Sequence, residues 1–245
     1  MERAIRLDCF QNLANYKKPS SFIMRETFPL PPYSTVLGMI HVACGFTEYH
    51  PMRLSIQGTN TGIISEVYTR YSFLAGEKYK PRHQICVDDG EKYGIFRGIA
   101  NAELVCENRM VIHIIPQKSD FDQVFQALKY PPRYLALGRH EDLLNVEQVR
   151  DVEIFAEEEV TAKRELYVPV EAKDIYASFE VEELPQGFAS VVVYNLTKEY
   201  EITPQGLRRW KKDGGRIRAY YCPKGKAFEM AYVDEVEPEA ALVFA

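Results

Sequence analysis

Hydrophobic and polar positions change their spacing several times along the chain, and each change predicts a new element. Apolar residues alternate over 4–13, which predicts a first strand. Over 36–44 they recur every three or four residues, which is typical of a helix with one buried face. We expect Ser34 or Thr35 to cap this helix and Gly45 to end it in a left-handed conformation.

The central part of the chain returns to alternation. A strand is predicted from residue 53 to about residue 67. We interpret the long polar stretch over 62–99 as an extended hairpin or lid with a turn at Asp89-Gly90. A run rich in Val and Ile predicts a further strand over 103–115.

A second amphipathic helix is predicted from Phe121 to Leu128. Ser119 and Asp122 have the spacing of a capping box, and Pro131-Pro132 would end the helix. A strand near 152–156 follows. The resulting order, strand, helix, strand, hairpin, strand, helix, strand, is that of a ferredoxin-like (RRM-like) domain, so the predicted fold class is α+β.

The remainder of the chain is rich in strands, and we expect it to form a β-rich C-terminal extension. We place a boundary at the acidic run 157–159, which divides the chain into an RRM-like domain over 1–157, with its hairpin, and a second domain over 158–245. The clearest strands of the extension are predicted over 188–196, 216–222 and 226–236.

Composition indicates a cytoplasmic protein with a substantial core. Apolar residues make up 46% of the 245 residues, and the N-terminus lacks a signal-peptide pattern. No apolar run reaches the roughly 18 residues that a membrane-spanning helix needs. The five cysteines are scattered and never spaced as Cys-x-x-Cys, so we expect reduced thiols rather than disulfides or zinc ligands.

Charge is segregated along the chain. The net charge is −5, which disfavours a free-standing nucleic-acid binder, because neutralising phosphates supplies most of the affinity of such proteins. Residues 151–205 carry a net −9, whereas residues 206–226 carry +7. This polarity suits a subunit that meets RNA on one face and proteins elsewhere, although unequal solvated surfaces would give the same numbers.

The common catalytic and metal-binding motifs are absent from the sequence. We expect His41, within the first helix, and His113, within a strand, to be structural residues. His83 and His140 each follow an arginine and are expected to contact solvent or RNA. Paired carboxylates at turns and helix starts are more often caps than ligands, so we expect no metal and no cofactor.

RNA-binding candidates fall into three groups. Cations near the start of the first helix would add to its dipole, aromatic residues between cations on the hairpin would stack bases, and a Leu-Gly-Arg turn would let a guanidinium grip phosphate. An ordinary strand pair and a plain turn are the alternatives for the last two groups. The candidates are Tyr16, Lys17, Lys18, Arg25, Tyr68, Arg70, Tyr71, Gly138, Arg139 and His140.

The most basic stretch, residues 207–212, holds the only tryptophan and follows Thr203, a possible cap. We expect a short helix that contacts phosphate or a partner protein, with a packed tryptophan on a solvated basic face as the alternative. The RNP1 motif of ordinary RRM proteins is absent, so the usual sheet-surface stacking lacks support. The candidate contacts are Arg208, Arg209, Trp210 and Lys211.

Two stretches resemble a known family. The segment 28–40, Phe-Pro-Leu-Pro-Pro-Tyr-Ser-Thr-Val-Leu-Gly-Met-Ile, with Ala43-Cys44-Gly45-Phe46 after it, is similar to the proline-to-helix signature of the Cas-five family of CRISPR-associated RAMP proteins. The segment 134–142 resembles that family's Leu-Gly-Arg signature. The long hairpin and strand-rich tail are most similar to the type I-B branch.

The resemblance implies a subunit of a type I CRISPR surveillance (Cascade-type) complex in antiviral defence. Such a subunit caps the 5′ handle of the guide RNA, projects a hairpin thumb, here 62–99, against the neighbouring backbone subunit, and contacts the large subunit. It would meet target DNA only through the complex, and no membrane. By the same resemblance, Lys17, Lys18, Arg25 and Arg139 would lie near handle phosphates.

The resemblance also bears on catalysis. One branch, type I-C, cleaves precursor RNA with a tyrosine and an adjacent Lys-His pair, but this sequence contains no Lys-His dipeptide and no lysine beside His113. We therefore expect a protein that is not an enzyme. The alternatives are a metal-independent endoribonuclease, with His83 or His140 acting beside Arg82 or Arg139, and a scaffold that contacts only proteins.

Overall fold

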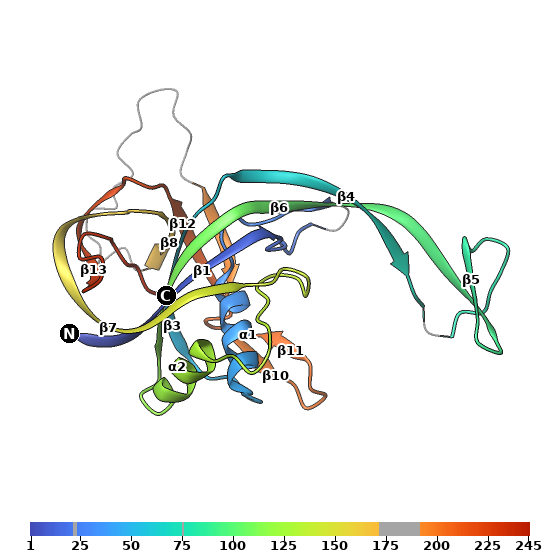
Figure 1. Cartoon of the computed structure of the whole chain (residues 1–245), viewed down its shortest axis with the longest axis horizontal. Coiled ribbons are helices and arrows are strands. Elements are labelled where there is room, and N and C mark those ends of the chain that lie inside the picture. The colour runs from blue at the N-terminus through green and yellow to red at the C-terminus, as the bar shows by residue number, and fades with distance from the viewer. Residues whose placement is uncertain (22–23, 75, 172–191) are drawn as a thin grey trace, which may run out of the picture.

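The computed structural model describes residues 1–21, 24–74, 76–171 and 192–245 and shows a large, mostly antiparallel sheet with two α-helices (Figure 1). The prediction of an α+β fold is confirmed. The helices are α1 (Tyr33–Cys44) and α2 (Phe121–Lys129). The strands are β1 (Glu2–Ala14), β2 (Met24–Arg25), β3 (Met52–Thr59), β4 (Gly62–Ser72), β5 (Ile85–Asp88), β6 (Lys92–Pro116), β7 (Asn145–Thr161), β8 (Glu165–Pro169), β9 (Val193–Thr197), β10 (Tyr200–Ile202), β11 (Arg208–Trp210), β12 (Arg216–Cys222) and β13 (Ala227–Asp234).

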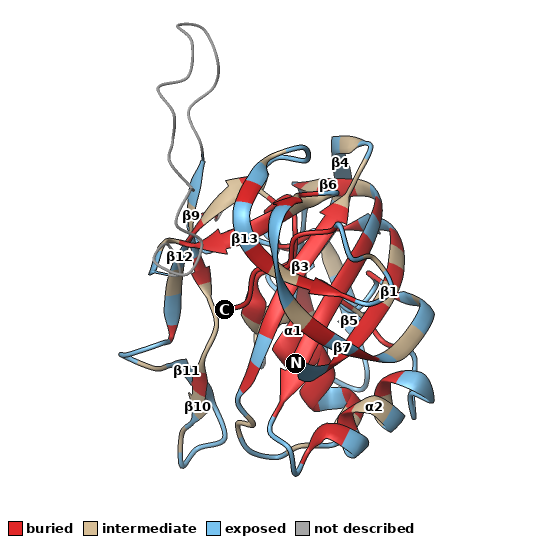
Figure 2. Cartoon of the chain, turned by 90° about the vertical axis from the view of Figure 1, so that its left-hand side faces the viewer, coloured by how far each residue is buried: buried red, intermediate tan, exposed pale blue. Residues whose placement is uncertain are grey.

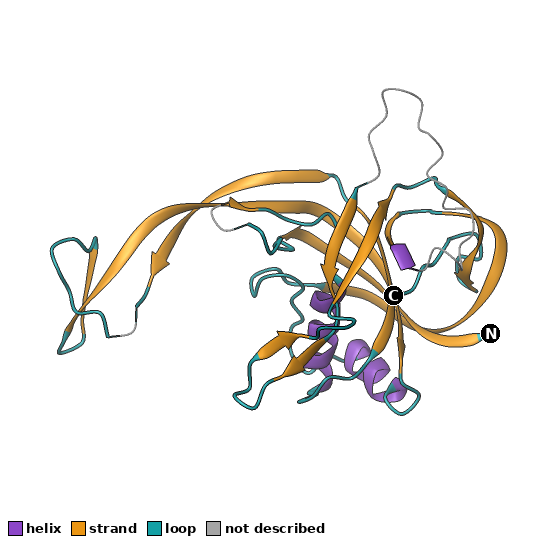
Figure 3. Ribbon diagram, turned by 180° about the vertical axis from the view of Figure 1, so that it is seen from behind, coloured by secondary structure: helices purple, strands orange, loops and turns teal. Residues whose placement is uncertain are grey.

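The sheet runs in the order β13-β7-β1-β6-β3-β8-β12-β9, and β10 and β11 form a separate hairpin. Both helices pack against each other on one face of the sheet (Figures 1 and 3). Alternate residues of β1, including Ile5 and Leu7, meet the buried stripe of α1, including Leu37 and Ile40, in the main core. Figure 2 shows these buried positions running along the central strands.

The longest strand, β6, belongs both to the core sheet and to a projecting hairpin. Its C-terminal half lies between β1 and β3 in the core, whereas its N-terminal part pairs with β4 and β5 in a hairpin that extends far from the body (Figure 1). The strand predicted over 53–67 is therefore wrong in extent, because β3 ends at Thr59 and β4 begins at Gly62. We call β4, β5 and residues 92–106 of β6 the arm.

The C-terminal strands continue the same sheet at both of its edges. β13 pairs with β7, and β8 pairs with β3 and β12. The boundary expected after residue 157 lies inside β7. The strand predicted over 216–222 is confirmed as β12 and that over 226–236 as β13, while residues 188–191 of the remaining one lie outside the described residues and the rest overlaps β9.

The predicted C-terminal ends of the two helices agree with the structure, whereas the predicted N-terminal caps do not. Gly45 ends α1 with φ of 72°, and α2 ends before Pro131, as predicted. Neither helix has a side-chain cap, so the expected caps are wrong. The hydroxyl of Ser34 is instead hydrogen-bonded to that of Thr197, and Ser119 donates to Asp120.

The two described helices are short. With 12 and nine residues, α1 and α2 fall short of the length and apolar composition that a membrane-spanning helix requires.

Candidate nucleic-acid interface

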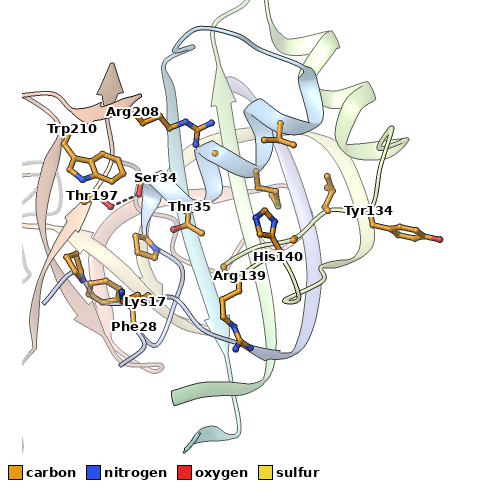
Figure 4. Close-up of a pocket in the computed structure, with 18 of the residues that line it drawn as sticks. Lys17, Phe28, Ser34, Thr35, Tyr134, Arg139, His140, Thr197, Arg208 and Trp210 are labelled. Carbon is orange, nitrogen blue, oxygen red and sulfur yellow. Dashed lines mark hydrogen bonds between the residues drawn. The ribbon is translucent and has the colours of Figure 1, made fainter. Parts of the chain in front are cut away.

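A cleft of about 840 Å³ lies along α1, from Ser34 to Val42 (Figure 4). The loop over 133–140, between α2 and β7, forms one wall. Thr197 of β9 and two residues of β11 form the other wall, and Lys17, in the loop after β1, closes one end. Segments from four distant parts of the sequence therefore meet along one helix.

The Leu-Gly-Arg wall is held by a buried carboxylate. Asp142, with a side chain only 1% exposed, accepts hydrogen bonds from the backbone N–H of Asn15 at 3.0 Å and of Arg139 at 2.8 Å. The Gln11 amide donates to the carbonyls of Leu137 and Asp142, both at 2.9 Å. These bonds attach the loop to the end of β1 and fix the position of the wall.

Glycine is required at position 138 of this loop. Its φ is 113°, which side chains rarely adopt. A Cβ there would lie 2.8 Å from a carboxylate oxygen of Asp142 and 2.9 Å from the Asn15 carbonyl oxygen. Gly138 therefore serves the close approach of two loops, and it also lines the cleft.

Arg139 is paired with carboxylates of its own loop. Its guanidinium is forked on Asp142, with the shortest contact at 2.7 Å, and lies 3.2 Å from Glu141. The hydrogen bond to Asp142 raises the pKa of the guanidinium above its usual value. Arg139 lines the cleft but points away from Arg208 (Figure 4). The Nε and Nη2 groups are engaged by Asp142, so the predicted fork of Arg139 on phosphate oxygens stays a prediction.

The opposite wall is a β-hairpin and not the predicted helix. β10 and β11 pair, the Thr203 N–H donates to the Leu207 carbonyl at 2.8 Å, and Gly206 has a φ of 76° in the turn. The Thr203 hydroxyl accepts from the Leu207 N–H at 3.1 Å, so it closes this turn rather than capping a helix. The left-handed glycine and the cross-strand pairs explain why a helix does not form.

Strand alternation divides the basic residues of β11. Arg208 and Trp210 line the cleft, and the Arg208 guanidinium lies 4.7 Å from the ring centre of Tyr200. Arg209, on the other face of the strand, is ion-paired with Glu201. Two of the predicted contacts are therefore in the cleft.

Lys211, the remaining predicted contact of this segment, lies outside the cleft lining. Its ammonium is 2.9 Å from Glu199 and 4.5 Å from the ring centre of Tyr49. These contacts hold the base of the hairpin beside α1.

The cleft is cationic although the chain is acidic. Its lining includes Lys17, Arg133, Arg139 and Arg208, and none of the described residues that line it is an aspartate or a glutamate. Such a surface attracts anions and is suited to a phosphate backbone. Sequence reasoning missed Arg133, although it directly precedes the segment that carries the Leu-Gly-Arg signature.

Two of the candidates near the first helix are engaged elsewhere. Tyr16 is 1% exposed, and its hydroxyl donates to Gln11 at 2.6 Å and accepts from Asn108 at 3.0 Å. Its predicted RNA contact is therefore wrong, because the ring belongs to the core. Lys18 is paired with Glu26 at 3.3 Å, beside the cleft, whereas the neighbouring Lys17 lines it.

Arg25 and the arm lie next to the Leu-Gly-Arg loop. The Arg25 guanidinium is 5.3 Å from the ring centre of Tyr68 on β4. The Asn15 side chain donates to the Arg25 carbonyl at 2.9 Å, while its backbone binds Asp142. The structure thus brings the base of the arm and the cleft together through one asparagine.

The arm candidates separate by strand alternation. Tyr68 and Arg70 of β4 lie on the same face of the sheet as Arg25 of β2, since Arg25 pairs with Ala102 and Tyr68 with Ala100 on β6. Tyr71 occupies the opposite face and is 48% exposed. The predicted trio therefore cannot form one continuous surface.

The histidines follow the predictions in part. His41 and His113 are buried and hydrogen-bonded, as expected of structural residues. His83, expected to meet solvent or RNA, is enclosed in the arm, with its Nδ1 accepting from the Lys80 N–H at 2.9 Å, so that prediction is wrong. His140 is exposed and lines the cleft.

No metal cluster accompanies these residues in the part of the chain that the structure describes. Within the described ranges, no group of three or more His, Cys, Asp or Glu side chains is arranged to hold an ion.

Comparisons with known proteins add a family relationship. The family model described as CRISPR-associated protein (Cas_Cas5) matches residues 4–207. A chain of a CRISPR RNA-guided surveillance complex is similar at 14% identity, over 99% of this chain and 91% of that one, with a TM-score of 0.49. A CRISPR protein from Archaeoglobus fulgidus is similar at 10% identity, over 100% and 99%, with a TM-score of 0.46. No curated protein sequence matches the chain.

Proposed function

We propose that this chain, which belongs to the CRISPR-associated protein (Cas_Cas5) family, is a non-catalytic subunit of a type I surveillance complex that binds and caps the 5′ handle of the guide RNA. The observation that carries the proposal is the cleft over α1. In it, cations from the loop after β1, from the loop before β7 and from β11 converge without a carboxylate in the lining.

Electrostatics support RNA as the ligand. The cleft opens beside the first turn of α1, where the helix dipole and backbone N–H groups favour negative charge. Lys17 and Arg208 line the cleft, and neither has an ion pair with a carboxylate among the described residues. Both cations are therefore available to phosphate oxygens.

The fold supports the proposed place in a complex. We interpret β1-α1-β3-β6-α2-β7, with strand order β7-β1-β6-β3 and both helices on one face, as a ferredoxin-like unit. The arm is then the thumb that contacts the neighbouring backbone subunit, and its exposed apolar residues, such as Val67 and Ile99, suit a protein contact. We assign the chain to the type I-B branch, with a further contact to the large subunit.

A non-catalytic role is supported by the side chains that a nuclease would need. His83 is enclosed in the arm, and the Arg139 guanidinium is held by Asp142. His140 is exposed in the cleft and is the residue on which an endoribonuclease would depend. Incubation of the purified chain with repeat RNA in EDTA should leave the RNA intact, and cleavage that His140→Ala abolishes would establish the nuclease instead.

The proposal is tested by a matched pair of substitutions on one strand. Arg208→Ala removes a cleft cation, whereas Arg209→Ala removes a neighbouring arginine that faces Glu201. In complexes purified with their RNA, Arg208→Ala should lower retention of RNAs that share one 5′ end. It should also make the negative slope of log affinity against log salt shallower by about 0.7, the value for one single-strand phosphate contact.

The control defines the contrary result. Arg209→Ala should leave RNA retention unchanged. If Arg208→Ala and Lys17→Ala together also leave it unchanged while the complex assembles, the chain is a protein-contacting scaffold and the proposed RNA role is wrong.

A further inference from the structure

The floor of the cleft has a chemistry that phosphates alone do not explain. α1 presents Gly38, Met39 and Val42 to the cleft, and Val42 is 46% exposed there. The cations come from the flanking segments and not from this floor. An apolar floor between cationic edges matches a ligand with a flat apolar part and a charged backbone.

Gly38 keeps this floor open. It lies inside α1, where glycine is unfavourable because it has the greatest backbone freedom to lose. A Cβ at this position would lie 3.4 Å from Nη1 of Arg208, so a longer side chain would extend into the space between the helix and β11. Glycine destabilises the helix at this position, but the absence of a side chain leaves the space between α1 and β11 open.

Trp210 supplies a flat wall beside this space. Its side chain lines the cleft, is 42% exposed, and lies near Thr197 and Ser34 (Figure 4). An exposed indole next to an arginine is a stacking surface for a nucleobase, and single-stranded RNA is commonly recognised through unstacked bases on aromatic rings. Because Trp210 is the only tryptophan of the chain, its fluorescence reports on this wall alone.

We infer that the cleft over Gly38 receives one unpaired base of the bound RNA, which stacks on Trp210 while Arg208 and Lys17 hold the backbone. This inference rests on the proposed function and adds to it a base subsite and its stacking residue. It predicts that the chain distinguishes RNA from a bare sugar-phosphate chain of equal length and charge.

The test compares two probes on the purified chain. One is a short mixed-sequence single-stranded RNA with a fluorescent 3′ label, and the other is the same chain without bases. The base-bearing RNA should quench Trp210 emission with the same midpoint as its anisotropy change. The abasic probe should bind about 5- to 150-fold more weakly, which corresponds to about 1 to 3 kcal/mol for one stacked base, and should leave the emission unchanged.

Substitutions locate the subsite. Trp210→Ala should weaken binding of the base-bearing RNA by a similar factor and leave binding of the abasic probe unchanged. Trp210→Phe should retain most of the difference in affinity between the two probes. Gly38→Leu should fill the cleft and remove the preference for bases, whereas Gly38→Ala, with its Cβ in ordinary contact distance, should retain it. Trp210→Phe leaves the backbone hydrogen bonds of β11 in place, so the test still gives a result if Gly38→Leu fails to fold.

The outcomes distinguish the base subsite from the proposed RNA-binding function on which it rests. If the labelled RNA binds tightly while Trp210 emission stays constant and Trp210→Ala has no effect, the base subsite is wrong and the RNA-binding role stands. If neither probe binds, the proposed function and the base subsite are both overturned.

Discussion

At the residue scale, one carboxylate determines the shape of the candidate site. Asp142 receives backbone N–H groups from two loops and the guanidinium of Arg139, so a single side chain joins the end of β1 to the Leu-Gly-Arg loop. The side chain of Asp142 is 1% exposed, whereas that of the neighbouring Glu141 is 63% exposed and pairs with the same arginine at the surface. Asp142 should therefore contribute more to the stability of the fold than the adjacent Glu141.

The first prediction compares these two carboxylates. Asp142→Ala should lower the free energy of unfolding by about 3 kcal/mol, because it leaves buried N–H groups and a guanidinium without their acceptor. Glu141→Ala should change it by less than about 1 kcal/mol, as for an exposed ion pair. Urea unfolding of the two variants measures the difference, and equal effects would show that Asp142 does not hold the loop.

At the scale of elements, β6 joins two regions of different character. Residues 109–114 are flanked by β1 and β3 in the core, but in the arm β4 is exposed or half-exposed at every position. A two-stranded hairpin of this kind buries little surface, and independent stability normally needs further packing. The arm tip gains some packing from His83, which fills the space beside Gly94.

The second prediction concerns removal of the arm. Replacing residues 70–98 by an Asn-Gly turn joins Thr69 to Ile99, which already pair across the hairpin. The body should keep its thermal unfolding midpoint within a few degrees, since the main core cluster contains no residue of this segment. Calorimetry measures this midpoint, and a cooperative loss of the whole fold would show that the arm supports the body.

The same deletion also tests the role of the arm in assembly. Trp210 should still respond to RNA, while copurification with the backbone subunit should be lost. Retention of that subunit by the shortened chain would contradict the assignment of the arm as the thumb.

At the scale of the whole molecule, a buried polar network joins the beginning, middle and end of the chain. Arg6 of β1 and His113 of β6 both donate to Asp234 of β13, at 2.8 and 2.7 Å. Burial by itself would raise the pKa of Asp234, but the bonds from His113 and Arg6 outweigh it and hold that pKa well below its usual range. Burial lowers the pKa of His113, although Asp234 opposes this effect.

The third prediction is a loss of stability in mild acid. The Nδ1 atom of His113 is buried and has no hydrogen-bond partner in the described parts of the chain, so the folded protein favours the neutral ring. The unfolded chain takes up a proton near pH 6.5 and the folded chain only at lower pH. Stability should therefore fall as pH drops below about 6.5, by at most about 1.4 kcal/mol per pH unit for this proton.

A histidine substitution isolates this contribution. His41, whose pKa burial also lowers, acts with the same sign, so His113→Gln should reduce the slope between about pH 6.5 and 5 without abolishing it. Asp234 adds a second loss below its unfolded pKa of about 3.9. Unfolding curves from about pH 7 down to about pH 3 measure both steps, and an unchanged slope of His113→Gln between about pH 6.5 and 5 would show that His113 does not contribute.

The sequence by itself determined the local elements of this protein and two of the segments at its candidate site. The helical stripe that ends at Gly45, the helix before Pro131 and the alternating run of β12 are all readable because periodicity reports which side of an element is buried. The signatures at 28–40 and 134–142 likewise indicated the first half of α1 and the loop opposite it.

Tertiary structure alone decided which side chains meet. Arg208 reaches Gly38 across some 170 positions of sequence, Arg139 is occupied by Asp142, and Tyr16 is buried in the core. Residues 208–210 of the basic segment form a strand because they pair with β10 after the turn at Gly206. Local spacing sets how a residue faces its own element, whereas the ligand-binding surface depends on strand register and loop contacts between distant segments, which no local pattern encodes.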